Sequence, residues 1–180
     1  MKAMVVYESL YGNTAAIGEA IAEALADHGL EVEAGPDSRI EPSETAGVDL
    51  LVVGGPTHAH GMSWTGTRKT AATDAKNPYP EPTADPGLRG WMNRLPPGRG
   101  RLGAAFDTRF DKAASITGSA ARGIARRLEA HAFRAVVEPE SFFVTGDNHL
   151  QDGEIDRARL WGIAVAERCT SNAEARRRPL

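Results

Sequence analysis

Three short apolar runs, each followed by glycine or polar residues, constrain the fold of this chain more than any other feature. They lie at residues 3–7, 49–53 and 141–144. Runs of this length and composition are typical of central parallel strands that helices cover on both faces. Residues 30–34, with an alternating pattern, and residues 102–106 are two weaker candidates. The sequence therefore predicts five strands.

Stretches with helical spacing separate these runs. In the first stretch, apolar residues recur at intervals that predict one buried helix face: Ile17, Ala20, Ile21, Ala24 and Leu25. Similar patterns predict helices over residues 87–95, 119–131 and 154–168, in which Trp91 and Trp161 are expected to be packing residues. Strands that alternate with helices predict an α/β fold with a doubly wound, five-stranded parallel sheet.

The length of the chain favours a single domain. Its 180 residues are enough for one sizeable core. We expect one domain over residues 1–170 and a solvated C-terminal tail over residues 171–180. Residues 62–101 are rich in proline, glycine and charge, and we expect them to hold only the helix at 87–95, preceded by an irregular excursion through residues 77–82. Long irregular segments in compact domains are often functional.

Charge and composition argue against several classes of function. The net charge of −3 and the absence of a polybasic run argue against a nucleic-acid partner and a membrane partner. No apolar run approaches the roughly 20 residues that span a bilayer, and the first residues lack a signal peptide, so we expect a cytoplasmic protein. Cys169 is the single cysteine, which excludes an internal disulfide and a cysteine metal cluster.

The loop between the first strand and the first helix contains several neutral hydrogen-bond donors. It supplies two hydroxyl groups, an amide and a glycine: Ser9, Thr14, Asn13 and Gly12. Ligands of doubly wound sheets bind outside the carboxyl ends of the strands, and a helix N-terminus favours an anion. The loop has neither the Walker spacing nor the three-glycine dinucleotide pattern, so a phosphate monoester fits it best. The alternative is a plain strand-to-helix turn in which Thr14 is the N-cap.

The pattern Ser-x-x-Gly-Asn-Thr at residues 9–14 resembles the phosphate loop of flavodoxins and of the flavodoxin domains in flavodiiron proteins. Tyr11 replaces a threonine of many flavodoxins, a variant associated with the flavodiiron and quinone-reductase branches. Residues 49–58, 102–110 and 153–162 resemble, in order, the third strand with its flavin loop, the fourth strand with its flavin loop, and the last helix. The resemblance implies a flavodoxin-like fold with strand order 2-1-3-4-5 and FMN as the cofactor.

The resemblance also implies which residues contact the cofactor. His58, or else His60 or Trp64, would cover one face of the isoalloxazine, and Phe110 would cover the other in place of a tyrosine. The full predicted set comprises the first loop, Ser9, Leu10, Tyr11, Gly12, Asn13 and Thr14; the second loop, Pro56, Thr57, His58, Ala59, His60 and Gly61; and the third loop, Asp107, Thr108, Arg109 and Phe110.

Each of these residues has a simpler alternative. The histidines could lie on a surface loop, and Phe110 could close the core. Asp107 and Arg109 could pair with each other, or could contact the pyrimidine ring through their backbone. No further metal ligand lies near His58 and His60 in sequence, so we expect no metal site.

The function that the resemblance implies is electron transfer between redox partner proteins, with FMN supplying the chemistry and no catalytic residue required. One alternative is an NAD(P)H-dependent quinone or flavin reductase that uses His58, His60 and Arg109, with residues 62–86 forming the nicotinamide or quinone pocket. Another is a flavin-free regulatory domain. Flavodoxin carriers are usually strongly acidic, whereas this chain has 24 acidic and 21 basic residues. That balance predicts a less negative potential for the fully reduced flavin.

Overall fold

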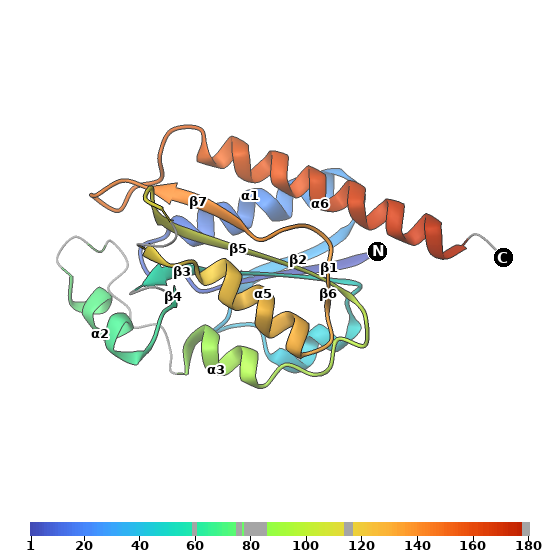
Figure 1. Ribbon diagram of the computed structural model, residues 1–180, viewed down its shortest axis with the longest axis horizontal. Helices are drawn as coiled ribbons and strands as arrows, with labels where there is room; N and C mark the ends of the chain where they lie inside the picture. The colour runs from blue at the N-terminus through green and yellow to red at the C-terminus, as the bar shows by residue number, and fades with distance from the viewer. Residues whose placement is uncertain (59–60, 75–76, 78–85, 114–116, 178–180) are drawn as a thin grey trace.

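A central parallel sheet between two layers of helices forms the molecule (Figure 1). The computed structural model describes residues 1–58, 61–74, 77, 86–113 and 117–177, the last five of these by their backbone alone. The central strands, in spatial order, are β2 (Glu31–Pro36), β1 (Lys2–Tyr7), β3 (Leu50–His58) and β5 (Leu102–Phe110), all parallel.

Two short strands share the edge beyond β5. β6 (Arg134–Ala135) pairs with Leu102 and Gly103 at the start of β5, and β7 (Glu140–Val144) pairs with its second half. Together they occupy the fifth position of the sheet, so the predicted order 2-1-3-4-5 is confirmed. A further strand that the sequence did not indicate, β4 (Gly61–Met62), pairs antiparallel with the end of β3.

Helices cover both faces of this sheet. α1 (Asn13–Asp27) and α6 (Glu154–Arg177) lie on one face, and α3 (Gly87–Asn93) and α5 (Ala120–Ala130) lie on the other (Figure 1). The 3-10 helix η1 (Pro42–Gly47) connects β2 to β3, and α2 (Thr65–Thr73) lies near the carboxyl ends of the strands. No helix among the described residues is both long and apolar enough to span a bilayer.

The alternation of side chains along the strands divides the core in two. Val5 and Val52 pack under α1 and α6, whereas Val6 and Val53 pack under α3 and α5. This follows from the two-residue period of a strand, which sends neighbouring side chains to opposite faces. The two faces therefore need a helical layer each, as the runs of consecutive apolar residues predict.

The predicted packing roles of Trp91 and Trp161 are confirmed. Trp91 is fully buried beneath the sheet, and its indole N–H donates to the carbonyl oxygen of Ile40 at 2.6 Å. Trp161 makes edge-to-face contacts with Phe106 and Phe142, with ring centroids 6.3 and 6.4 Å apart. Edge-to-face pairs of this kind add to the stability that area burial provides.

Three boundaries differ from the sequence prediction. Residues 62–101 contain α2 as well as α3, and α2 has no apolar stripe, so its helical spacing was not visible. Helix α6 continues to Arg177, past the predicted end at residue 168. β3 and β5 run to His58 and Phe110, because β4 and β7 pair with their ends, so residues expected in loops lie on strands.

Candidate functional site

A pocket lies at the carboxyl ends of β1, β3, β5 and β7, where ligands of this fold class bind. Its enclosed cavity is about 60 Å³, and the pocket opens directly to solvent. Its walls come from all three predicted segments and from one further loop: Leu10, Tyr11, Asn13, Thr14, Pro56, Thr57, His58, Thr108, Arg109, Phe110, Val144 and Asn148.

The first predicted loop forms the N-terminus of α1. Gly12 is the N-cap and has a φ of 85°, a left-handed conformation that favours glycine. The Ser9 hydroxyl accepts a hydrogen bond from the Ala15 amide at 3.1 Å, and the Gly12 carbonyl accepts one from Ala16 at 3.0 Å. The alternative in which Thr14 is the N-cap is therefore wrong, because Gly12 is the N-cap and Thr14 is the second residue of the helix.

The donors of this loop retain hydrogens for a ligand. Ser9 accepts from Ala15, so its own hydroxyl hydrogen is not used in that bond. Thr14 and Thr108 share one hydrogen bond at 2.8 Å, which leaves the hydrogen of the accepting hydroxyl. Asn13 uses one amide hydrogen on the Asn148 carbonyl at 2.7 Å and keeps the other. The loop can therefore bind an anion without breaking its internal bonds.

Tyr11 differs from its neighbours in the loop. Its hydroxyl donates to the Asp74 carboxylate, which follows α2, at 2.8 Å. Burial, followed by the hydrogen bond to Asp74 and the negative charge of Asp74, raises the pKa of Tyr11 to about 12. The single hydroxyl hydrogen is used in this bond, so Tyr11 could bind a phosphate only through its backbone amide. The contact ties the first loop to the segment after α2.

The second predicted loop includes the end of β3, which pairs with β4. His58 lies on β3, pairs with Gly61 on β4, and faces the pocket half-buried. Burial lowers the pKa of His58, which favours the neutral imidazole. Ala59 and His60 lie outside the described residues. Trp64, the other candidate for this face, is 55% exposed at the start of α2 and does not line the pocket.

Asp107 is a structural residue and not a pocket residue. Its fully buried carboxylate accepts hydrogen bonds at 2.8 to 2.9 Å from the Thr57 hydroxyl, the Ser119 hydroxyl and the Ala121 amide. The Thr57 hydroxyl in turn accepts from the Ala120 amide at 2.8 Å. Asp107 therefore fixes the N-terminus of α5 against β3 and β5, where the helix dipole favours a negative charge. It does not pair with Arg109.

Arg109 and Phe110 form the pocket wall contributed by β5. The Arg109 guanidinium lies over the Phe143 ring at 5.0 Å and donates to the carbonyl of Phe110 and the hydroxyl of Thr117. Its buried Nε has no hydrogen-bond partner within the described part of the chain. Phe110 is 44% exposed, so the alternative in which it closes the core is wrong. An exposed phenyl ring at a pocket wall is available for stacking.

Two pocket residues, Val144 and Asn148, were missed at the sequence level. Val144 ends β7, and Asn148 lies in the turn that follows, with a φ of 59°. The signal was present, because the fifth strand also ends at this edge and the stretch Thr-Gly-Asp-Asn is typical of a turn.

A buried group of charged side chains, also missed, lies beside the first loop. Glu8 is fully buried, accepts a hydrogen bond from the Ser63 hydroxyl, and lies 3.9 Å from the guanidinium of Arg68, itself 5% exposed. Burial raises the pKa of Glu8, against the effects of Ser63 and Arg68. Burial and the charge of Glu8 together raise the pKa of Asp37 to about 7. The group connects β1 and β2 to α2.

Comparisons with solved structures identify the fold. A flavodoxin from the domain Archaea superposes with a TM-score of 0.66 at 21% identity, over 94% of this chain and 99% of that one. Flavodoxin 2 from Bacillus cereus gives 0.68 at 16% identity, over 93% and 99%. Rubredoxin oxygen:oxidoreductase from Desulfovibrio gigas gives 0.62 at 16% identity, over 96% of this chain but 37% of that one.

The chain therefore has the flavodoxin-like fold. The likeness extends over nearly the whole length of the chain and of the single-domain flavodoxins that it resembles. No protein-family model matches the sequence, and no curated protein matches it. The structural superposition establishes the architecture, while the function has to be argued from the site.

Proposed function

We propose that this chain binds FMN and transfers electrons between redox partner proteins. The observation that supports this most directly is the junction of two features in one pocket. One is the helix N-terminus of α1 with its hydrogen-bond donors, and the other is the part of the pocket lining that contains His58 on β3 and Phe110 on β5. A mononucleotide needs both, a donor set for one phosphate and a place for a flat ring.

The residues present fit that cofactor. Ser9 and Asn13 keep donor hydrogens for the phosphate, and the Thr14–Thr108 pair keeps one on the hydroxyl that accepts. The helix N-terminus adds backbone amides and a favourable dipole. Phe110 offers an exposed aromatic face for the isoalloxazine. FMN, when bound, supplies one- and two-electron redox chemistry, and the side chains of the pocket orient it and exclude water from one edge.

A titration of flavin-free protein with FMN, riboflavin and FAD tests this proposal. We expect FMN to bind more tightly than riboflavin, because riboflavin lacks the phosphate and a hydrogen bond to a charged group is worth about 1.5–3 kcal/mol. FAD should bind less tightly than FMN, since its second phosphate has no dinucleotide site. Equal affinity for FMN and riboflavin would refute the phosphate role of the first loop.

The second candidate is an NAD(P)H-dependent quinone or flavin reductase. The observation that favours it is Arg109, a cation in the pocket wall with a buried, unsatisfied Nε among the described residues. A positive charge there stabilises an anionic reduced flavin and suits two-electron chemistry. Steady-state oxidation of NADH and NADPH by the FMN-loaded protein, with a quinone as acceptor, separates the two. Turnover in the absence of any reductase protein would favour the enzyme.

A further inference from the structure

The charges of this chain are unevenly distributed along the sequence. Residues 87–134 contain ten lysine and arginine residues but only three acidic residues, whereas the rest of the chain contains 11 basic and 21 acidic residues. One of the three acids in that segment, Asp107, is buried at the start of α5. The net charge of −3 thus conceals a strongly basic segment in an otherwise acidic protein.

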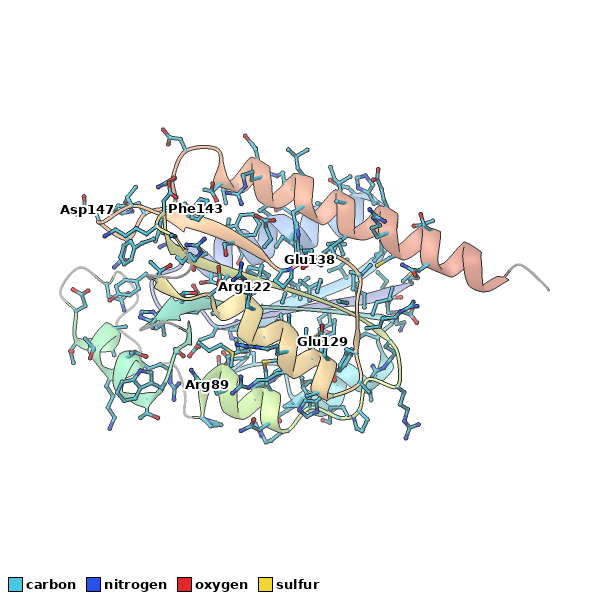
Figure 2. All side chains as sticks on the ribbon, in the orientation of Figure 1. Arg89, Arg122, Glu129, Glu138, Phe143 and Asp147 are labelled. Carbon is cyan, nitrogen blue, oxygen red and sulfur yellow. The ribbon has the colours of Figure 1, made fainter. Side chains whose placement is uncertain are left out.

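The fold places the two helices of this segment in one layer. Residues 87–134 form α3, β5 and α5, and the two helices cover the same face of the sheet. Figure 2 shows Arg122 and Arg89 on the same side of the molecule, near the end of the helices that lies toward the pocket, and Glu129 near the far end of α5. The acid on α5 therefore lies at the end of the helix away from the pocket, while Arg122 lies near the end toward it (Figure 2).

The arginines of α5 are not neutralised by neighbours. No described carboxylate lies within ion-pair distance of Arg122, Arg126 or Arg127; the ion pairs of the described residues are formed elsewhere. Burial lowers the pKa of Arg127, and the like charges of Arg89 and Arg126 lower it further. Like charges gathered without counterions are costly to the fold. Their presence on one surface indicates a binding role.

The helix that carries these arginines begins beside the pocket. The Ala120 amide at the start of α5 donates to the hydroxyl of Thr57, a pocket residue, and Arg122 lies two residues further along the helix. Arg126 follows one helical turn later, about 6 Å along the axis at 1.5 Å per residue. Arg109, near the end of β5, lines the pocket itself. A partner seated on α5 would lie beside the cofactor edge.

We propose that the basic face of α5, defined by Arg122, Arg126 and Arg127, is the docking surface for an acidic redox protein. The proposal rests on the proposed electron-transfer function and adds the partner's chemistry to it. A compact acidic partner covers the basic face alone. An extended polyanion such as DNA would also meet the acidic remainder of the surface within a Debye length, about 10 Å at 0.1 M salt, and would be repelled there.

The test uses two haem proteins of opposite charge as probes, an acidic cytochrome b5 and a basic cytochrome c. The FMN-loaded, fully reduced protein is mixed with each oxidised probe, and the rate of reduction is followed at increasing salt. We expect reduction of the acidic cytochrome to slow about tenfold or more from 10 to 300 mM salt, because salt screens steering by opposite charges. Reduction of the basic cytochrome should not slow in this way.

A matched pair of variants locates the surface. Arg126→Glu on α5 should slow reduction of the acidic cytochrome at low salt by about fivefold or more, since rim charges chiefly change association rates. Arg168→Glu makes the same charge change at an exposed position of α6, on the opposite layer, and should leave the rate within about twofold. Equal effects of the two variants would overturn the proposal, as would a rate that does not depend on salt.

Direct binding of the acidic cytochrome, measured by surface plasmon resonance, separates the two proposals. Salt-sensitive binding that Arg126→Glu weakens supports the docking surface even if the chain binds no FMN, in which case the electron-transfer function fails alone. FMN binding and electron transfer without salt-sensitive docking would overturn the surface and leave the function standing. Tighter binding of duplex DNA than of the cytochrome would also overturn the acidic-protein partner.

Discussion

Asp37, which directly follows β2, should make this protein less stable at neutral and alkaline pH than at acidic pH. Its half-buried carboxyl group lies near the buried side chains of Glu8 and Arg68, and loss of hydration together with the Glu8 charge raises its pKa from 3.8 to about 7. The folded state therefore retains a proton that the unfolded state releases between these two values. Stability is highest below pH 4 with respect to this residue and falls as pH rises through 7.

The magnitude follows from the shift. Each pH unit between the unfolded and the folded pKa costs about 1.4 kcal/mol, so the interval from pH 5 to pH 7 costs about 3 kcal/mol, and little more is lost by pH 8. Asp37→Asn removes the titration and keeps an oxygen acceptor for the backbone amides of residues 37 and 38. The variant should gain about 3 kcal/mol relative to the parent protein between pH 5 and pH 8.

Urea denaturation at both pH values measures this difference. The exposed Glu33, also on β2, provides the control, because Glu33→Gln removes a carboxylate that no described residue pairs with. We expect the control to follow the parent protein at both pH values. Parallel stabilities of Asp37→Asn and the parent between pH 5 and pH 8 would show that Asp37 titrates normally, and the reasoning from burial would be wrong.

Four further predictions concern the site and the buried group. Thr14→Ala should weaken FMN by about 1.5–3 kcal/mol and leave riboflavin nearly unchanged, as measured by flavin titration; equal losses would contradict a phosphate role. Phe110→Ala should weaken FMN and riboflavin alike by about 1 kcal/mol and recover flavin fluorescence, whereas a loss confined to FMN would misplace the ring. Arg68→Met should lower the free energy of unfolding by about 3 kcal/mol at pH 8 and by less at pH 5, where the Glu8 it leaves unpaired takes up a proton more readily; a pH-independent loss would indicate packing alone. In flavin-free protein the NMR titration midpoint of His58 should lie below 6.5 because of burial, and bound reduced FMN should raise it; a midpoint at or above 6.5 without flavin would contradict the burial.

The first loop, residues 9–14, illustrates what sequence reasoning could reach. Its position between a strand and a helix, and the glycine before the helix, are local properties, and the structure places Gly12 and Asn13 accordingly. The sequence indicated that Ser9 could donate to a ligand, but not that its hydroxyl accepts a hydrogen bond within the loop. A hydroxyl that accepts from Ala15 can still donate to a ligand, but the acceptance itself depends on how the loop closes over the helix.

Asp107 shows where sequence reasoning could not suffice. In sequence it stands beside Thr108 and Arg109, which suggested flavin contact or an ion pair. In the fold its carboxylate lies against Thr57 and the start of α5, which are 50 and 12 to 14 residues away. Only the pairing of β3 with β5 brings these groups together, so no local pattern could assign the residue its role.

The sequence by itself determined the strands, the helices with an apolar stripe, and the edge of the sheet where a ligand can bind, because each follows from periodicity and chain direction. The tertiary structure alone decided that α2 forms without an apolar stripe, that Glu8 and Arg68 are buried together, and that the arginine-bearing helices α3 and α5 cover the same face of the sheet. These features depend on contacts between segments distant in the chain. The energies of these contacts depend on which side chains are buried and on the distances between charged groups in the fold. The order of residues along the chain does not specify either.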